Sequence, residues 1–252
     1  MQVAMAKRKT TPLKDFAPDG HHCSLDLKTT KLGMVSFFQD LEQDVLDEIV
    51  KRFTATHYRE GDEIYYQGDP AHYLRVVVDG AAKLLRYTDE GKDVVLDILN
   101  PGSYFGSLKL LGSDVYTESA EAQSGCCILS IGLKDFREIL QEYPSVGIAI
   151  LEMSAEKLRS SQEQIKQLTT ESVETRIANI LLILTDKFGE VKEDKTLIQL
   201  PFSRKDLADM AGTTTESASR VMSNFQKEGI IETGRQWVAI KNIEMLRSIV
   251  EH

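Results

Sequence analysis

The chain has 252 residues, a formal net charge of −9 and 42% hydrophobic residues. This length is enough for two domains with cores of their own, and no apolar run is long enough to span a membrane. The three cysteines are an odd number and no pair has the C-x-x-C spacing of a zinc site, which fits a reducing compartment without a disulfide framework.

The N-terminal segment, residues 1–30, is polar and aperiodic and is predicted to be a flexible arm. Its basic residues 7–9 are not followed by an apolar run, so we expect no secretory signal and a cytoplasmic protein. The trio His21-His22-Cys23 offers metal or heme ligands, but three adjacent side chains do not converge on one ion without an unusual backbone. No metal site is predicted.

Residues 31–142 are predicted to form a β-roll sensor domain. Apolar residues have helical spacing from Phe37 to Phe53, and short alternating runs begin near Thr56. Glycine-rich turn signals then recur about every ten residues, which is typical of a sandwich, barrel or jelly roll. The strands predicted between these turns are 73–78, 82–87, 93–99 and 127–131.

Residues 143–170 are predicted to form one long dimerisation helix that opens at Pro144. Apolar residues step by three and four along it between polar flanks, which leaves a narrow stripe suited to a second copy of the chain. The alternative is that the helix packs only against its own domain. The predicted dimer seam consists of Ile148, Leu151, Ala155, Leu158, Gln162 and Ile165.

Residues 171–252 begin with a helix over 174–188 and then show two helices joined by a tight turn. Ser203 can cap the first of these helices, with Asp206 at its third position, and Gly212 ends it. A second cap from Thr213 or Thr214 starts the next helix, which ends at residue 229.

Residues 230–240 alternate like a β-hairpin, so this unit is predicted to be a winged helix-turn-helix with Arg235 at the wing tip. Arginine can bind guanine through two hydrogen bonds, and glutamate can accept one from cytosine, so DNA binding is favoured over a solvated face of a protein-interaction module. The outward residues of the second helix are Thr214, Thr215, Glu216, Ser219 and Arg220.

The acidic net charge does not extend to this unit, because residues 200–241 hold six basic residues against five acidic ones. Screening acts over about 8–10 Å at ordinary salt, so the local charge governs contacts with phosphates. We therefore expect modest nonspecific affinity and a dimer.

A glycine-turned β-roll, a long helix and a winged helix-turn-helix in this order resemble the cyclic AMP receptor / fumarate-nitrate regulator (CRP/FNR) family of bacterial transcription factors. The resemblance covers roughly residues 32–245. Its motifs are Arg59-Glu-Gly61, Gln67-Gly68-Asp-Pro70, Val78-Asp-Gly80, Pro101-Gly-Ser-Tyr-Phe-Gly106, Phe202-Ser-Arg-Lys-Asp-Leu-Ala208 and Glu216-Ser-Ala-Ser-Arg220. It implies an α+β homodimer that binds double-stranded DNA and RNA polymerase and is not an enzyme.

The winged helix-turn-helix, called the head below, is similar to that of the fumarate-nitrate branch, whose recognition helix carries Glu-x-x-Ser-Arg. This similarity implies a TTGAT-like palindrome as the binding site. The hydroxyls of Thr213 and Thr214, with Ser203 and Arg235, are expected near the phosphates. The alternative is a cyclic-nucleotide-binding-like sensor or scaffold that acts through protein contacts. No nucleophile–base or metal constellation supports an enzyme.

In family members that bind cyclic AMP, the sixth roll segment reads Gly-Glu-Leu and is followed by Arg-Ser, which bind the ribose and the cyclic phosphate. Here the equivalent positions, which form the expected effector pocket, are Gly106-Ser107-Leu108 and Thr117-Glu118. Ser107 lacks the ribose acceptor and Glu118 would repel a phosphate, so cyclic AMP is not expected as the effector.

The chain offers ligands for some of the other sensing groups that family members use, but not for all of them. An iron–sulfur cluster needs four cysteinates, which Cys23, Cys126 and Cys127 cannot supply within one subunit. His57 and His72 lie in or beside the roll as candidate heme ligands, although ordinary surface histidines are the favoured interpretation. The two adjacent cysteines should point to opposite faces of a strand, one in the core and the other solvated or covered by a loop. The cofactor stays open among heme, thiol redox, a small-molecule or gas effector, and none.

Overall fold

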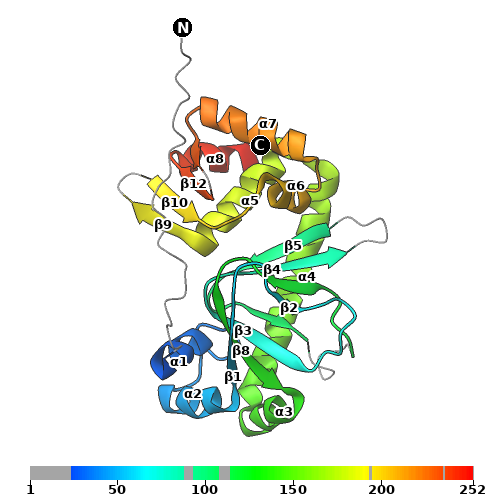
Figure 1. The fold of residues 1–252 in the computed structure, drawn as a ribbon, viewed down its shortest axis with the longest axis vertical. Helices are drawn as coiled ribbons and strands as arrows, with labels where there is room; N and C mark the ends of the chain where they lie inside the picture. Colours follow the sequence, from blue (N-terminus) through cyan, green and yellow to red (C-terminus); the bar gives the residue numbers. More distant parts are fainter. Residues whose placement is uncertain (1–23, 88–92, 108–113, 193–194, 235, 252) are drawn as a thin grey trace. The chain divides into compact units, whose positions relative to one another are not determined.

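A computed structural model of the chain describes residues 24–87, 93–107, 114–192, 195–234 and 236–251. The described residues divide into two compact units, one up to Thr169 and the other from Thr170 onward (Figure 1). Helices and antiparallel sheets both occur in each unit, which confirms the predicted α+β class. No helix of the described part is both long and apolar enough to cross a bilayer.

The first unit opens with helices α1 (Leu25–Gly33), α2 (Gln43–Ile49) and η1 (Val50–Arg52). The Ser24 hydroxyl caps α1 by accepting from the Leu27 N–H at 3.2 Å. Thr29 and Leu32 are buried in this helix. The prediction of a flexible arm through residue 30 is therefore wrong for residues 25–30, because they carry a capped helix with a buried face. His21-His22-Cys23 lies outside the described residues.

Two four-stranded antiparallel sheets form the roll in the described part of the chain. The first, in the order β1-β8-β3-β6, contains β1 (Thr54–Tyr58), β8 (Cys126–Gly132), β3 (Tyr73–Asp79) and β6 (Tyr104–Gly106). The second, in the order β2-β7-β4-β5, contains β2 (Glu63–Tyr65), β7 (Ser119–Ala122), β4 (Ala82–Tyr87) and β5 (Asp93–Leu99).

The middle strands β8 and β3 of the first sheet are buried on both faces. The inner face of this sheet packs against the second sheet in a core that includes Val77 and Phe105, which we call the inner core. Its outer face packs against the helices in a core that includes Phe38 and Phe136, which we call the helical core. This double burial explains why β3 has five consecutive buried residues, 74–78, where a half-exposed strand would alternate.

The adjacent residues Cys126 and Cys127 of β8 point into different cores, Cys126 into the inner core and Cys127 into the helical core. Their opposite orientation was predicted from the strand period. Both side chains are buried, however, so the expectation of one solvated or loop-covered cysteine is wrong. The strand lies in a sheet that is covered on both faces.

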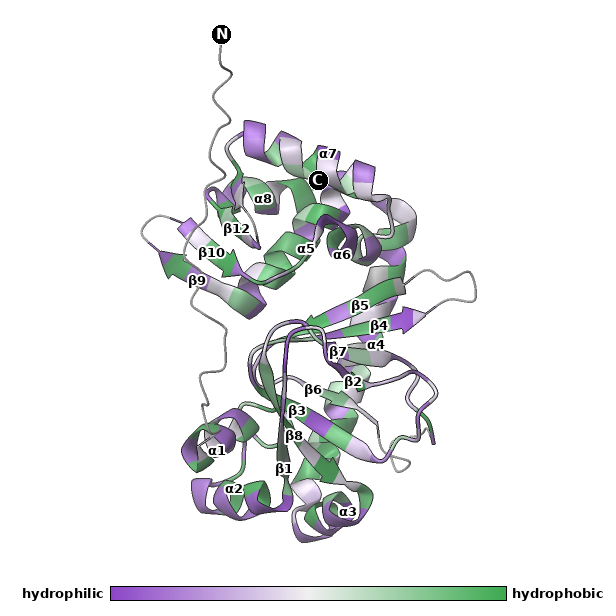
Figure 2. Ribbon diagram, viewed as in Figure 1, coloured by the Kyte–Doolittle hydropathy of each residue, from purple (hydrophilic) through white to green (hydrophobic). Residues whose placement is uncertain are grey.

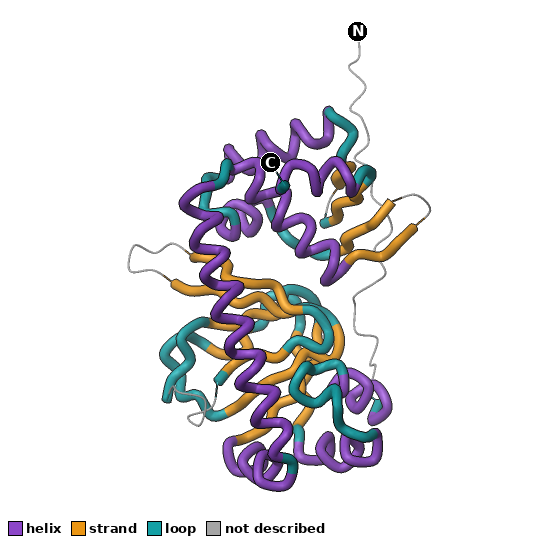
Figure 3. Tube along the Cα trace, turned by 180° about the vertical axis from the view of Figure 1, so that it is seen from behind, coloured by secondary structure: helices purple, strands orange, loops and turns teal. Residues whose placement is uncertain are grey.

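The roll is followed by α3 (Leu133–Glu142) and the long helix α4 (Pro144–Thr170), which runs along the roll in the view from behind (Figure 3). Val146, Ala149, Ile150 and Met153 of its first turns pack against the helical core. The alternative of packing on its own domain is thus realised for this part of the helix.

The second unit contains two further strands and a last helix besides the predicted winged helix-turn-helix. Its sheet has the order β11-β12-β10-β9. The elements are α5 (Val173–Phe188), β9 (Gly189–Lys192), β10 (Lys195–Gln199), α6 (Arg204–Met210), α7 (Thr215–Lys227), β11 (Ile231–Gly234), β12 (Trp237–Ile240) and α8 (Ile243–Val250). The strands β9 and β10 and the helix α8 were not predicted.

Candidate nucleic-acid interface and effector site

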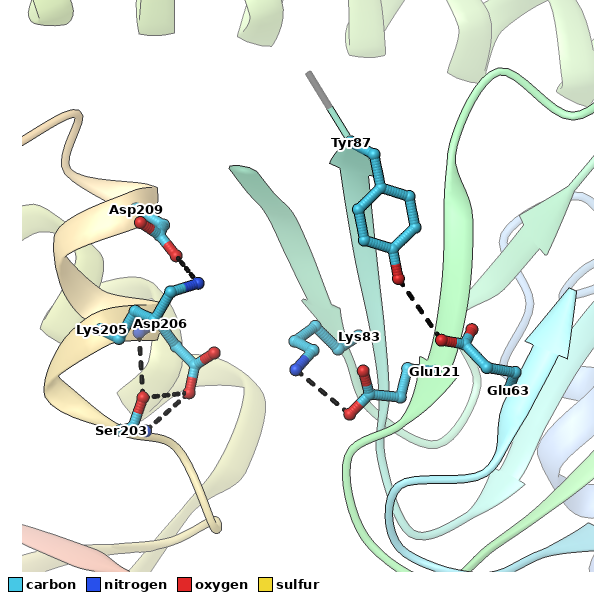
Figure 4. A network of polar contacts seen from close by, with 8 residues as sticks. All are labelled: Glu63, Lys83, Tyr87, Glu121, Ser203, Lys205, Asp206 and Asp209. Carbon is cyan, nitrogen blue, oxygen red and sulfur yellow. Dashed lines mark hydrogen bonds and ion pairs between the residues drawn. The ribbon is translucent and has the colours of Figure 1, made fainter. Parts of the chain in front are cut away.

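The helix α6 begins at the predicted capping box. The Ser203 hydroxyl accepts from the Asp206 N–H at 3.1 Å, and the Asp206 carboxylate accepts from the Ser203 N–H at 2.7 Å (Figure 4). The same carboxylate accepts from the Ser203 hydroxyl at 2.7 Å. The backbone N–H and the hydroxyl of Ser203 thus both form hydrogen bonds with Asp206, and Ser203 serves as the N-cap of α6. A phosphate contact from Ser203 would have to compete with these bonds.

Small residues line the crossing of α6 and α7. Ala208, Ala211 and Ala218 are each at most 1% exposed, and Gly212 takes the left-handed region with φ +58° in the turn between the helices. Larger side chains at these buried positions would push the two helices apart. The helix-turn-helix geometry predicted from the sequence is confirmed.

The helix α7 presents the predicted reading residues on its solvent side. Thr214 is its N-cap, with its hydroxyl accepting from the Ser217 N–H at 3.2 Å, which decides between the two predicted caps. Ala218, Met222 and Phe225 form the buried face. The ribbon of α7 accordingly alternates between hydrophilic and hydrophobic colours (Figure 2). On the other side Thr214, Thr215, Glu216 and Arg220 are exposed, and Thr213 and Ser219 are half-buried.

Glu216 and Arg220 have no ion-pair or hydrogen-bond partner among the side chains that the structure describes. Other charged residues of the head are engaged, such as Lys205, whose Nζ lies 3.2 Å from the Asp209 carboxylate (Figure 4). The guanidinium of Arg220 therefore keeps its paired N–H donors, and the carboxylate of Glu216 its acceptors, for a ligand in solution.

The wing is the hairpin of β11 and β12, in which Gly234 pairs with Trp237. Gln236 in the connecting turn has φ 63°, the left-handed conformation that such tight turns use. Arg235 lies outside the described residues, so its place at the wing tip stays a prediction.

The expected effector residues gather around one aromatic cluster in the roll. Gly106 ends β6 with φ +80°, and a β-carbon there would lie 2.8 Å from the Tyr73 carbonyl oxygen and 3.5 Å from the Tyr116 ring. The Tyr116 ring stacks on Tyr65 with centroids 3.9 Å apart, and the Tyr65 hydroxyl donates to Glu118 at 3.4 Å. Burial, and then the negative charge of Glu118, raise the pKa of Tyr65 well above its usual range.

Glu118 is also the acceptor of a hydrogen bond from the Thr117 hydroxyl. Thr117 is exposed, and Ser107 and Glu118 are half-buried. Leu108 lies outside the described residues. The structure thus brings Gly106, Thr117 and Glu118 to the same tyrosines and leaves a carboxylate at the position where the resemblance places a cation.

Arg75 in β3 is a charged residue of this cluster that the sequence analysis missed. It is 8% exposed, and its guanidinium carbon lies 4.8 Å from the centroid of the Tyr65 ring. Its Nε has no hydrogen-bond partner. Leaving a buried N–H without an acceptor costs about 1–3 kcal/mol, which cation–π contacts of about 0.5–2 kcal/mol offset in part. The available signal was a single arginine inside an otherwise apolar strand.

The two histidines and the free cysteine Cys126 of the roll offer little for a metal or redox signal. His57 and His72 are exposed, and the described residues contain no group of three metal-ligating side chains. Burial raises the pKa of the Cys126 thiol to about 12, so this thiol is unreactive at neutral pH. Cys127 is disulfide-bonded, so the expectation of a chain without disulfides is wrong at this residue.

The predicted seam of α4 is a line of exposed side chains. Ile148, Leu151, Leu158 and Ile165 are 60%, 72%, 62% and 63% exposed. Ala155 and Gln162 are exposed between them. Exposed apolar residues this large and this regularly spaced on one helix mark an interaction surface.

Two family models match the chain. The Cyclic nucleotide-binding domain matches residues 55–143, and the Crp-like helix-turn-helix domain matches residues 175–249. These ranges contain most of the roll and nearly all of the second unit. The matched order, sensor domain before helix-turn-helix, is the order predicted from the sequence.

Curated relatives match along most of their length. The Cyclic AMP receptor protein of Thermus thermophilus is 27% identical over 213 residues, which cover 84% of this chain and 95% of the relative. The Transcriptional activator protein anr of Pseudomonas aeruginosa is 26% identical over 205 residues, which cover 81% and 83%.

Among solved structures, FixK2 from Bradyrhizobium japonicum has a TM-score of 0.70 at 24% identity and covers 78% of this chain and 96% of its own. This likeness supports the fold. The two domain matches and the named relatives, which are regulators and not enzymes, assign the protein: the chain belongs to the CRP/FNR family of DNA-binding transcription regulators.

Proposed function

We propose that the protein is a homodimeric, cytoplasmic regulator that reads a TTGAT-like palindrome through α7 and contacts RNA polymerase from that site. The observation that carries this proposal is the pair Glu216 and Arg220, both exposed on α7 and both without a partner in the described part of the chain. A regulator keeps such groups unpaired because the bases are their partners.

Within this proposal the head residues have two roles. Arg220 lies one turn after Glu216 and can present two donors to guanine O6 and N7, a pairing worth about 1–3 kcal/mol of discrimination. Ser219 and Thr215 lie on the same helix beside them. Thr213, Thr214 and Arg235 contact phosphates, which positions α7 without specifying sequence, and Ser203 supports the DNA-binding unit by capping α6.

The dimer forms through the exposed line of α4. Two copies of this line, packed in parallel, would bury Ile148, Leu151, Leu158 and Ile165 and place Gln162 opposite itself as a polar residue that sets register. In a two-fold dimer the two α7 helices enter successive major grooves about 34–36 Å apart. We assign residues 31–142 to the sensor, 143–170 to the dimer helix and 171–252 to DNA binding.

The signal acts on the roll and is neither cyclic AMP nor an iron–sulfur cluster. Glu118 places a carboxylate at the aromatic cluster that Gly106 also contacts, and the hydroxyls of Tyr65 and Thr117 donate hydrogen bonds to it. A cyclic phosphate seated at the Thr117-Glu118 position would meet repulsion where the family's cyclic-AMP binders supply an arginine.

The test is a binding titration of the wild type, Arg220→Ala and Arg235→Ala against a TTGAT palindrome and its guanine-substituted versions at several salt concentrations. Arg220→Ala should lose most of the preference for the half-site guanine. Arg235→Ala should weaken all sequences alike and lower the salt slope by about one unit per subunit. If Arg220→Ala weakens every sequence by the same factor, Arg220 is a backbone contact and the assignment of reading residues is wrong.

A further inference from the structure

One charged side chain, Arg75, extends from the inner face of β3 into the space between the two sheets. Val76 and Val78 face the helical core and Val77 faces the inner core, so strand alternation places Arg75 on the side of Val77. Arg75 is 8% exposed. Because a guanidinium is not deprotonated in proteins, this is a buried positive charge.

The aromatic residues around Arg75 hold its guanidinium without neutralising it. The guanidinium carbon lies 4.8 Å, 5.5 Å and 5.2 Å from the ring centroids of Tyr65, Tyr73 and Tyr116. Nη1 donates to the Tyr116 hydroxyl at 2.6 Å and to the Tyr73 carbonyl at 3.3 Å. These partners are neutral, and no described carboxylate forms an ion pair with the guanidinium.

The other edge of the guanidinium, formed by Nε and Nη2, has no acceptor among the described residues. Nε is buried and unpartnered, and no described carboxylate forms an ion pair with Arg75. The carboxylate of Glu118, in the same cluster, accepts instead from Tyr65 and Thr117. An unused Nε/Nη2 edge has the planar fork that binds two oxygens of a carboxylate or phosphate.

We propose that Arg75 anchors an effector site for a small anion, bound through a carboxylate or a phosphate between the sheets of the roll. The anion supplies the missing counter-ion and the missing acceptor in one step. Tyr73, which is 46% exposed, is the member of the cluster open to solvent and marks the entrance. The anion site names the chemical class of the signal that the proposed function leaves open. Only its role in regulation rests on that proposed function.

The experiment uses the full-length protein and two probes, inorganic phosphate and acetate, with sodium chloride added to hold ionic strength constant. The near-UV circular dichroism of the tyrosines and the melting temperature are followed as each anion replaces chloride. We expect a saturable change in the tyrosine bands and a rise in melting temperature with at least one probe. The probe that binds at the lower concentration assigns the ligand to phosphate esters or to carboxylates.

Variants locate the binding. Arg75→Gln should abolish the saturable change, and Arg75→Lys, which keeps the charge but loses the fork, should weaken binding at least tenfold. Arg59→Gln is the matched control, because Arg59 is an exposed arginine in a turn of the same unit, and it should bind as the wild type does. If Arg75→Gln does not fold, the comparison of Arg75→Lys with the wild type decides.

The absence of a saturable change with both probes in the wild type overturns the proposal, and so does equal binding by the wild type and the Arg75 variants. Operator titrations of the same samples separate this result from the proposed function. Specific DNA binding without anion binding contradicts the anion site alone. Anion binding through Arg75 without any preference for the palindrome contradicts the DNA proposal alone.

Discussion

The indole of Trp237 fills the space beside Gly234, directly across the wing hairpin. A β-carbon at residue 234 would lie 2.1 Å from Trp237 Nε1, so only glycine lets the ring pack there. Gly234→Ala should displace the ring and lower the free energy of unfolding by about 1–3 kcal/mol. Trp237 is the single tryptophan, so its fluorescence emission should shift to longer wavelength. Gly229→Ala is the control, because it meets open space and strains only its φ of +73°; an unchanged emission in Gly234→Ala would contradict the packing.

Removing the capping hydroxyl of α6 should destabilise the head. Ser203→Ala loses the acceptor for the Asp206 N–H and should cost about 0.5–2 kcal/mol, measured by urea unfolding followed through Trp237 fluorescence. Ser223→Ala is the control, since the Ser223 hydroxyl donates only to the Ser219 carbonyl within a helix. Equal stability of Ser203→Ala and the wild type would show that the capping box contributes nothing here.

A charge in the α4 line should separate the dimer. Leu158, 62% exposed in the single chain, would face its own copy, and Leu158→Glu would place two carboxylates together in an apolar seam. Sedimentation should then show monomers with weak operator binding. Ser160→Glu, on an exposed position off the line, should stay dimeric. A dimeric Leu158→Glu would remove the coiled coil from the proposal.

Cyclic AMP should not bind as an effector, because Glu118 repels the phosphate and Ser107 lacks the ribose acceptor. Calorimetric titration of the purified dimer should give no saturable heat. The same titration with inorganic phosphate reports on Arg75 separately. Micromolar, saturable binding of cyclic AMP that also raises operator affinity would overturn this prediction.

The sequence predicted the elements whose pattern is long enough to show a period or whose ends carry caps. β3 and β5, with seven residues each, were found, as were both helices of the reading head with their caps. β2 and β6 have three residues each and were missed, because three residues do not distinguish an alternating strand from a turn. The short helix α1 was read as an arm because it buries only Thr29 and Leu32.

The two candidate sites differ in how much of each could be predicted from the sequence. The outward face of α7 follows from helical periodicity within thirteen residues, so Glu216 and Arg220 could be named in advance. The cluster at Arg75 depends on residues from separate segments of the chain, such as Tyr116, which is 41 positions away and precedes β7. Only the folding of the roll brings the residues of this cluster together. The apolar residues next to Arg75 in the sequence do not predict the cluster.

The adjacent cysteines of β8 show that one strand connects the inner core of the roll with the helical core. Cys126 packs in the inner core and Cys127 in the helical core, so the strand β8 separates the two cores and is buried on both faces. Close-packed interiors transmit a displacement because they hold little empty volume. Val146 and Met153 at the start of α4 belong to the packing of the helical core, so β8 joins the tyrosine side of the roll to the first turns of the helix that carries the seam.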